Sequence, residues 1–494
     1  MQPALLTRWV LILAASYPLF FLGMGERGLV GPDEPRYASI AREMAESGDW
    51  VTPRLEGEPW FEKPALLYWL GASAHRLGLQ GDRAIRLPAM LISTAFLLFF
   101  HWRLSRYFSL QAADYATLIL ATSAGWVAFS QVGVFDMPLA ATVGTAMLLL
   151  LPWVEQPEQD HSKPLLAFGA LLGLGMLAKG LVALALAALA ILPVCYRRGW
   201  KPVARDLLHP RVVAPAVAVA GPWYLLCYLR NGSAFLEEFF VRHHFARLYS
   251  ADIQHVEPFW FFGPVLLVGM LPWTPLLALY PNQEMRRDPK TQFLLGWALT
   301  TFLFFSIPTN KLAGYLLPAL PPIAALMGIR LQKTSRAVLP LLAVALLLAL
   351  TPVAENILPA ALADGLGRAW PPTISSVWLP AIFVAFAGVT AWVESRGKRP
   401  FVLALLGLSA IFSFTLLKIN VFPPLDRAAG ARAIWLAVEA TAGQTCLGEV
   451  RRHVDYGLSY YSARQLPDCS ATPRSYRIEG DPPRVTSSPP VNAP

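Results

Sequence analysis

The residues best suited to catalysis or ligand binding are carboxylates and cations that lie at the edges of strongly apolar segments. Asp33, Glu62 and Asp136 could act as a base, bind a metal ion or recognise a cationic sugar. Several cations suit a phosphate or pyrophosphate group on a lipid. They are Lys63, Lys179, Arg242, His243, His244, Arg247 and Lys311, and Tyr315 follows the last of them. These residue types suit a group transfer in which a lipid phosphate leaves, because the leaving group needs charge stabilisation.

Each of these residues also has a purely structural interpretation. Asp33 and Asp136 stand two residues before a proline, where an aspartate commonly caps a helix. Glu62 and Lys63 could form a surface ion pair of little energy. Lys179 could extend to the membrane interface, although it lies in an apolar turn on the side that usually lacks lysine. The capping and the chemical interpretations are compatible, since a capping carboxylate still has a second oxygen.

The composition indicates the kind of element that must position these residues. The chain has 494 residues, of which 55% are hydrophobic and 15% charged, and its mean hydropathy is +0.45. Soluble chains carry about 25% charged residues, so a soluble enzyme, a disordered protein and a disulfide-rich secreted domain are excluded. The net charge of +9 is typical of cytoplasmic loops that orient a membrane protein, and we expect no nucleic-acid partner.

The chain contains about 13 apolar runs that approach the length needed to cross a bilayer. They lie near 9–23, 86–101, 110–130, 137–153, 164–178, 181–196, 212–229, 259–280, 291–307, 314–330, 337–354, 376–393 and 400–418. Backbone groups in lipid must be satisfied within the segment, so these runs are predicted to be helices. The first run lacks a small-residue cleavage site, and we expect it to be an uncleaved span rather than a signal peptide.

Lys and Arg concentrate in every second connection, which predicts the orientation. The basic connections are 103–106, 197–205, 286–290, 330–336 and 396–399. This pattern places the N-terminus in the cytoplasm and the C-terminal region outside. It also places these candidate catalytic and binding residues together on the outer side. Charge at the edge of hydrocarbon is costly, so such a cluster indicates function.

The first outer loop, residues 24–85, is long and patterned. The run Pro32-Asp33-Glu34-Pro35 resembles a helix start, and residues 36–47 predict an amphipathic helix on the membrane surface. A second helix is predicted after Glu62-Lys63-Pro64, through residues 66–70. We therefore expect two juxtamembrane helices to hold the first group of charges at the membrane boundary.

The C-terminal region differs from the rest of the chain. Residues 427–470 predict a small α/β unit, with a helix over 428–442 and a strand over 446–450, and residues 486–494 predict a flexible tail. We divide the chain into a membrane domain, 1–420, and a small outer domain, 421–494. Cys446 and Cys469 fall in that outer domain, where oxidation is allowed, and both the disulfide and the free thiols stay open.

Several motifs together resemble the aminoarabinose transferases of lipid A, which belong to the polytopic lipid-phosphate-sugar transferases and are related to protein O-mannosyltransferases. The resemblance begins with Gly31-Pro32-Asp33-Glu34-Pro35-Arg36-Tyr37-Ala38 and Ser47-Gly48-Asp49-Trp50, and continues with Phe61-Glu62-Lys63-Pro64 and Tyr68-Trp69. Weaker matches are Phe135-Asp136-Met137-Pro138, Lys179-Gly180, His255-Val256-Glu257-Pro258-Phe259-Trp260 and Lys311-Leu312-Ala313-Gly314-Tyr315. The match covers roughly residues 1–330.

This resemblance implies an all-α polytopic membrane protein with 13 transmembrane helices, juxtamembrane helices in the first periplasmic loop and a small periplasmic C-terminal domain. It also implies a sugar donor on undecaprenyl phosphate, an acceptor such as lipid A, and a location in the bacterial inner membrane with the active site facing the periplasm. The C-terminal unit is shorter than in the best-known members, so the sugar and the acceptor stay open.

The resemblance further assigns roles to matching residues. Catalytic roles fall to Asp33, Asp136, Glu62 and Lys63. The donor phosphate is expected to contact Lys63, Lys179, Arg247, Lys311, Tyr315 and Arg36. A divalent metal ion, either zinc or magnesium or manganese, is expected near the first-loop carboxylates, with Glu62 and His244 as its ligands. No organic cofactor is expected.

The mechanism we hypothesise is a single inverting displacement, in which an acceptor oxygen attacks the anomeric carbon and the polyprenyl phosphate leaves. Three alternatives stand beside it. A protein O-glycosyl transferase would use the same type of donor but would need a groove for a peptide. A lipid-linked sugar flippase or transporter predicts internal repeats, and we find none. A structural scaffold would leave Lys179 and the paired loop motifs unexplained.

Overall fold

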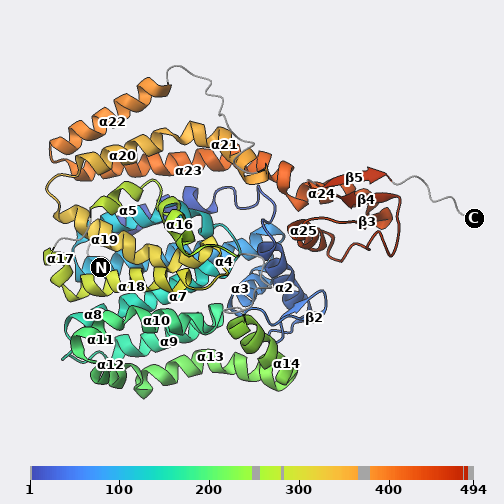
Figure 1. Cartoon of the computed structure of the whole chain (residues 1–494), viewed down its shortest axis with the longest axis horizontal. Helices are drawn as coiled ribbons and strands as arrows, with labels where there is room; N and C mark the ends of the chain where they lie inside the picture. Colours follow the sequence, from blue (N-terminus) through green and yellow to red (C-terminus); the bar gives the residue numbers. More distant parts are fainter. Residues whose placement is uncertain (1–2, 247–255, 280–282, 365–378, 482, 488–494) are drawn as a thin grey trace, which may run out of the picture.

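The computed structural model describes residues 3–246, 256–279, 283–364, 379–481 and 483–487, and most of these residues are helical. The helices lie side by side in one body, and a small unit with a β-sheet stands at one end of it (Figure 1). The predicted helical body and the predicted C-terminal α/β unit are therefore both present in this coarse form.

The first half of the body contains most of the predicted site residues. Its helices are α1 Pro3–Ser16, η1 Tyr17–Phe21, α2 Asp33–Ser47, α3 Leu66–Arg76, α4 Asp82–Tyr107, α5 Leu110–Ala121, α6 Ala124–Ser130, α7 Asp136–Leu149, α8 Leu151–Glu155, α9 Ser162–Lys179, α10 Val182–Ala190, α11 Leu192–Arg198, α12 Trp200–Leu207, α13 Pro210–Asn231, α14 Ser233–Leu236 and η2 Glu237–Ala246. The two helices predicted in the first outer loop are α2 and α3. A short hairpin lies between them, and its strands, β1 Arg54–Leu55 and β2 Glu58–Pro59, have two residues each.

The second half completes the helical body. It contains η3 Phe259–Phe261, α16 Phe262–Gly269, η4 Thr274–Ala278, α17 Gln283–Arg287, α18 Pro289–Ser306, η5 Ala313–Ala319, α19 Leu320–Lys333, α20 Val338–Ala349, α21 Thr351–Asp364, α22 Leu379–Ser395 and α23 Arg399–Ala429. Each predicted apolar run overlaps one to three of the helices in the two halves.

Several predicted spans are broken in the structure. Within the described residues, four helices are long and apolar enough to cross a membrane, and two bent pairs raise the number to as many as six. One of these pairs, α5 and α6, bends by 63°. At the bend the hydroxyls of Thr122 and Ser123 bond back to carbonyls of the preceding turn, and the Ala124 N–H donates to the Leu271 carbonyl. The predicted number of 13 spans stays a prediction.

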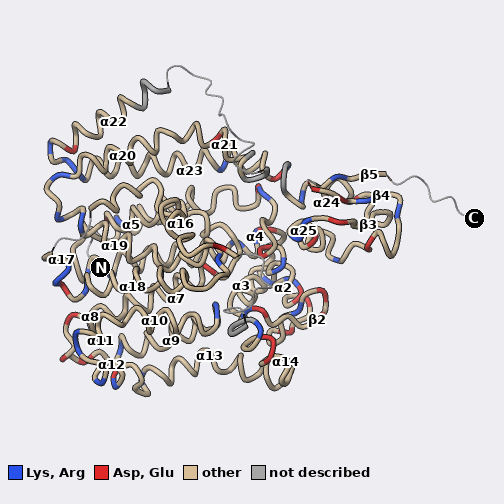
Figure 2. The backbone as a smooth tube through the Cα atoms, viewed as in Figure 1, with Lys and Arg blue, Asp and Glu red and all other residues tan. Residues whose placement is uncertain are grey.

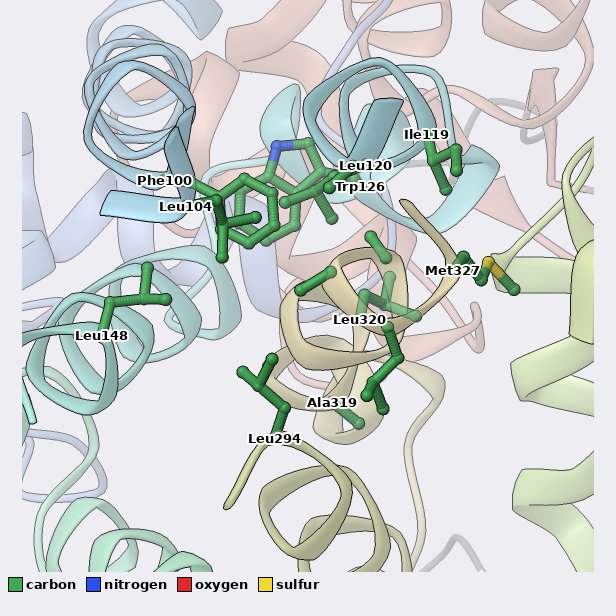
Figure 3. Close-up of a cluster of buried hydrophobic side chains, with 14 of the residues drawn as sticks. Phe100, Leu104, Ile119, Leu120, Trp126, Leu148, Leu294, Ala319, Leu320 and Met327 are labelled. Carbon is green, nitrogen blue, oxygen red and sulfur yellow. The ribbon is translucent and has the colours of Figure 1, made fainter. Parts of the chain in front are cut away.

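Small residues bring the helices of the body close together. A Cβ added at Gly328 in α19 would lie 2.5 Å from the backbone nitrogen of Ala116 in α5, and one at Gly169 in α9 would lie 2.1 Å from the Val212 carbonyl oxygen in α13. Such contacts are how helices associate in lipid, which offers no hydrophobic driving force between them. Figure 3 shows the large side chains that fill the interior, among them Phe100, Leu120, Trp126 and Leu320 from α4, α5, α6 and α19.

The C-terminal unit is built from α24 Ala431–Val438, η7 Glu439–Gln444, β3 Thr445–Leu447, α25 Arg452–Ser462, β4 Tyr476–Glu479 and β5 Arg484–Ser487. Its sheet has the order β3-β4-β5, parallel between β3 and β4 and antiparallel between β4 and β5. The predicted tail is wrong at its start, because residues 486 and 487 pair with β4 as part of β5. Helix α23 continues through residue 420, and the predicted domain boundary there stays a prediction.

Cys446 and Cys469 form a disulfide in the C-terminal unit, which settles the question the sequence left open. Cys446 belongs to β3, and Cys469 lies in the segment that leads from α25 to β4. The bond joins positions 23 residues apart and so restricts the unfolded chain. A loop of this size contributes about 3 kcal/mol to stability.

We predict that replacing both cysteines, Cys446→Ser with Cys469→Ser, destabilises the C-terminal unit by about 3 kcal/mol because the loop constraint is lost. The measurement is the rate of limited proteolysis of this unit in the full chain, purified in detergent without reductant. Wild-type protein treated with dithiothreitol is the control and should match the variant. Equal cleavage rates for oxidised and reduced wild-type protein would contradict the prediction.

Candidate active site

The first group of site residues lies where α2 begins and just before α3. Arg36, one turn after Asp33 in α2, places its Nη2 atom 2.5 Å from Asp33 Oδ1 and 3.1 Å from Glu62 Oε2. The Lys63 Nζ atom lies 2.8 Å from the other Glu62 oxygen. The four residues therefore form one alternating row of two carboxylates and two cations.

Burial differs along this row. The side chains of Arg36 and Glu62 are 6% and 7% exposed, whereas that of Asp33 is 36% exposed. Burial lowers the pKa of Arg36, but Tyr37 and the two carboxylates raise it more, so its pKa lies above the ordinary value. Arg36 is thus a permanent cation that holds an accessible Asp33 and an enclosed Glu62. Glu62 and Lys63 are not the weak surface ion pair that the structural interpretation described.

The second group joins three further elements. Asp136 is the first residue of α7, and Lys179 is the last residue of α9. The Lys179 Nζ atom lies 2.6 Å from Asp136 Oδ1 and 4.3 Å from the centre of the Tyr315 ring in η5. A Cβ added at Gly314 would lie 2.8 Å from Asp136 Cγ, so the chain at η5 packs directly on this carboxylate.

Neither aspartate acts as a helix cap. The capping positions of α2 and α7 are Pro32 and Phe135, and neither makes a side-chain capping bond. Asp33 and Asp136 are instead the first residues of their helices, where the helix dipole favours a negative charge, and each pairs with a cation. Capping is therefore not the reason for an aspartate at either position.

A buried ion pair connects the two groups. Glu34 and Arg86 are 0% and 1% exposed and bond through two parallel contacts of 2.7 and 2.8 Å. The Glu34 carboxylate also accepts from the backbone N–H groups of Val30 and Gly133, the latter three residues before Asp136. Burial raises the pKa of Glu34, but Arg86 and the N–H donors lower it more, so its pKa lies below the ordinary value.

Three aromatic rings reinforce this connection. Phe135, which directly precedes Asp136, contacts Tyr37 of α2 and Tyr68 of α3 edge to face, with ring centres 4.9 and 5.2 Å apart. Burial raises the pKa of both tyrosines well above 10, so their hydroxyls stay protonated. The start of α7 is thus packed against the two helices of the first loop.

The three remaining predicted phosphate or metal residues are Lys311, Arg247 and His244. Lys311 is buried and donates to the carbonyls of Glu257 and Pro308, so it joins two loop segments. Arg247 lies outside the described residues. The backbone of His244 lies in η2, but its side chain is outside the described part. The contacts predicted between these residues and a ligand stay predictions.

The residues of the first loop do not fit the expected metal ion. Both Glu62 oxygens are already paired with cations, Arg36 and Lys63, which would repel a divalent ion. Among the described residues, no group of three or more His, Cys, Asp or Glu side chains could hold a metal. We therefore derive no step through a metal ion.

Sequence reasoning did not assign a role to Glu34, Arg86, Gly314 or Tyr68. Arg86 begins a predicted apolar run, and Glu34 follows the predicted catalytic aspartate. The signal that could have identified the two residues was a charge next to an apolar segment. The Tyr68 hydroxyl is buried and, within the described part of the chain, makes no hydrogen bond. A buried hydroxyl without a partner marks a place where a ligand could bond.

The fold and the sequence are similar to those of known membrane proteins. The family model described as dolichyl-phosphate-mannose-protein mannosyltransferase matches residues 7–231. Among solved structures, the crystal structure of ArnT from Cupriavidus metallidurans bound to undecaprenyl phosphate matches with a TM-score of 0.77 and 25% identity, over 95% of this chain and 92% of that one. The arabinosyltransferase EmbB from Mycobacterium smegmatis, with a TM-score of 0.52 and 17% identity over 88% of this chain and 43% of that one, shares the fold alone.

Curated relatives narrow the comparison to one kind of transferase. Undecaprenyl phosphate-alpha-4-amino-4-deoxy-L-arabinose arabinosyl transferases from Aeromonas hydrophila and Edwardsiella ictaluri are 34% and 35% identical to the chain, each over 65% of it and 59% of the relative. The match thus spans about three fifths of the length of these relatives. The resemblance indicated by the loop motifs is confirmed.

We predict that Arg86→Met destabilises the protein by about 3–5 kcal/mol, because it leaves the buried Glu34 charge without its partner. The double variant Arg86→Met with Glu34→Met should lose less. Unfolding temperatures of the purified proteins in detergent measure both effects. Arg205→Ala, which removes a cation that is 80% exposed, is the matched control. An Arg86→Met variant as stable as this control would refute the prediction.

Gly314→Ala should lower turnover at this site by about ten- to hundredfold, because the new Cβ would displace Asp136 or Phe129. Gly263→Ala is the matched control, since a Cβ there meets no atom within 4 Å. Turnover by the two purified variants, measured with the same donor, tests this prediction. Equal turnover would mean that the Asp136 carboxylate does not need its present position.

Proposed function

We propose that this chain is a membrane glycosyltransferase that moves a sugar, 4-amino-4-deoxy-L-arabinose, from undecaprenyl phosphate to lipid A. The observation that carries the proposal is the pair of charged groups at the start of α2 and α7, in a chain that aligns along 95% of its length with a transferase bound to undecaprenyl phosphate. The names of the curated relatives support the sugar and the donor.

The proposed reaction is an inverting displacement. An oxygen of the acceptor attacks the anomeric carbon, the bond from that carbon to the phosphate oxygen breaks, and the undecaprenyl phosphate leaves with the electron pair. Lys63 and Lys179 are placed to balance the charge that develops on the leaving phosphate. The two cations are already fixed by Glu62 and Asp136, so little reorganisation is needed when the charge develops.

The role of Asp33 depends on the acceptor. A phosphate oxygen of lipid A is already anionic and needs no base, so Asp33 would then hold the ammonium group of the amino-sugar. A hydroxyl acceptor would need a base, and Asp33 is the more exposed of the carboxylates in its group. Arg36 pairs with the Asp33 carboxylate in either case.

The finer layout is part of the proposal. We place about 13 spans in the inner membrane, with the domain 1–420 carrying the first periplasmic loop, 24–85, and the domain 421–494 in the periplasm. Figure 2 supports this orientation, because Lys and Arg gather at the end of the body near α11, α12 and α17, whereas at the opposite end, around α2, β2 and the C-terminal unit, they are mixed with Asp and Glu.

A protein O-glycosyl transferase with a polyprenyl-phosphate sugar donor is the second candidate. The family model that matches residues 7–231 is named for transfer of mannose to protein, and it covers both charged groups. The two functions differ in the acceptor, so the mass of lipid A distinguishes them.

We predict that Asp33→Asn lowers sugar transfer by about hundredfold or more, because the carboxylate charge is lost while the shape is kept. Mass spectra of lipid A from donor-producing cells with wild-type protein, with the variant and without the protein provide the measurement. Only the wild-type cells should gain the mass of one amino-sugar. Asp160→Asn, at an exposed site, is the control. Unchanged lipid A in wild-type cells would favour the protein acceptor, and full activity of Asp33→Asn would exclude a role for this carboxylate.

A further inference from the structure

Arg36 is enclosed by three aromatic rings. Its guanidinium carbon lies 5.3 Å from the ring centre of Tyr37, 5.4 Å from that of Trp60 and 5.5 Å from that of Tyr456. Tyr37 and Trp60 belong to the first outer loop, but Tyr456 belongs to α25 of the C-terminal unit. We refer to these three rings as the Arg36 cage.

The cage matters because Arg36 holds both carboxylates through a single atom. Asp33 and Glu62 both pair with Nη2. Ion pairs made at the same nitrogen constrain the guanidinium plane less than a bidentate pair does, so the rings packed around the guanidinium help to fix that plane. Cation–π contacts with rings that exclude water supply that constraint. Removal of one ring therefore loosens the cation that sets the geometry of Asp33.

Helix α25 is held tightly against the first loop beside the cage. The Arg42 Nη1 atom donates to the Tyr460 carbonyl at 2.7 Å, and its guanidinium lies over the Tyr460 ring. The Tyr461 hydroxyl accepts from the Leu29 N–H at 2.8 Å and donates to Asp82 at 2.9 Å. These contacts occur one turn beyond Tyr456 and fix where its ring lies.

A second set of contacts fastens the base of the C-terminal unit. Arg432 of α24 pairs with Asp82 at 3.1 Å and with Asp426 at 2.6 Å, and it donates to the carbonyls of Gly25 and Glu26. The unit is thus seated on the first loop by ion pairs, hydrogen bonds and rings together. Its position over Arg36 is a defined interface.

We propose that Tyr456 is a positioning residue through which the docked C-terminal unit orders Arg36, and with it Asp33 and Glu62. This inference rests on the proposed function, since it concerns the same site. It makes the C-terminal unit part of the active site rather than a cover above it. The ring is what acts on Arg36, because among the described residues the Tyr456 hydroxyl accepts a hydrogen bond only from Arg452 Nη2, at 3.4 Å.

The test compares Tyr456→Ala with Tyr456→Phe in the purified full chain, with undecaprenyl phosphate-aminoarabinose as donor and lipid A as acceptor. Tyr456→Ala should lower kcat about tenfold with little change in the KM for the donor, as expected for one lost cation–π contact. Tyr456→Phe, which keeps the ring, should retain most of the activity. Arg451→Ala is the control, because Arg451 is exposed on the same unit and pairs with Asp481.

A double-mutant cycle separates positioning from general damage to the fold. If Tyr456 acts through Arg36, adding Tyr456→Ala to Arg36→Lys should lower kcat by less than twofold more. If Tyr456→Ala lowers kcat about tenfold in the Arg36→Lys background as well, the two effects are independent and the inference is overturned. A Tyr456→Ala variant as active as an active wild type would also overturn it. A wild type that transfers no sugar from this donor would instead overturn the proposed function, and with it any role for Tyr456 in that reaction. Unfolding temperatures of all variants show whether the chain has folded.

Discussion

The ion pair between Glu34 and Arg86 is the interaction on which the rest of the site depends. It is fully buried, and its carboxylate also accepts two backbone N–H groups, one from each of two separate loops. Arg86 donates in turn to the carbonyls of Met24, Arg27 and Gly28. The pair therefore joins the first outer loop, the start of α4 and the loop before α7. Asp33 lies one residue before Glu34, and Asp136 lies three residues after Gly133, so the separation of the two aspartates is set by a contact that neither of them makes.

Opposite charges alternate throughout the site, and this explains how so many ionised groups persist beside apolar helices. An isolated charge there would change its protonation state or draw in water, whereas a paired charge with aromatic neighbours stays fixed. The cations are consequently oriented by carboxylates before any phosphate arrives. The same arrangement disfavours a divalent ion at Glu62, whose oxygens both face cations.

The sequence predicted the local features of this site better than the contacts between residues far apart in the chain. The start of α2, the position of α3 and the apolar runs follow from helix signals and hydropathy, which depend on neighbouring residues. The ion pairs of Lys179 with Asp136 and of Arg86 with Glu34 depend on how the helices pack. The spacing of residues along a single sequence does not predict such packing. Hydropathy also missed the break between α5 and α6, because contacts from a distant segment satisfy the backbone there. Strand β5 was not predicted, because it is defined by its pairing with β4, a contact that the local sequence does not show.

The docking of α25 on the first loop has a consequence for biogenesis. Tyr456, Tyr460 and Tyr461 are translated after every described helix of the body, yet they contact residues of the first loop, which is translated several hundred residues earlier. A nascent chain that has inserted all of its membrane segments still lacks this contact. The site is thus completed only when the C-terminal unit has been made and has folded against the first loop, so a product truncated before α25 would contain both aspartates without the finished surroundings of Arg36.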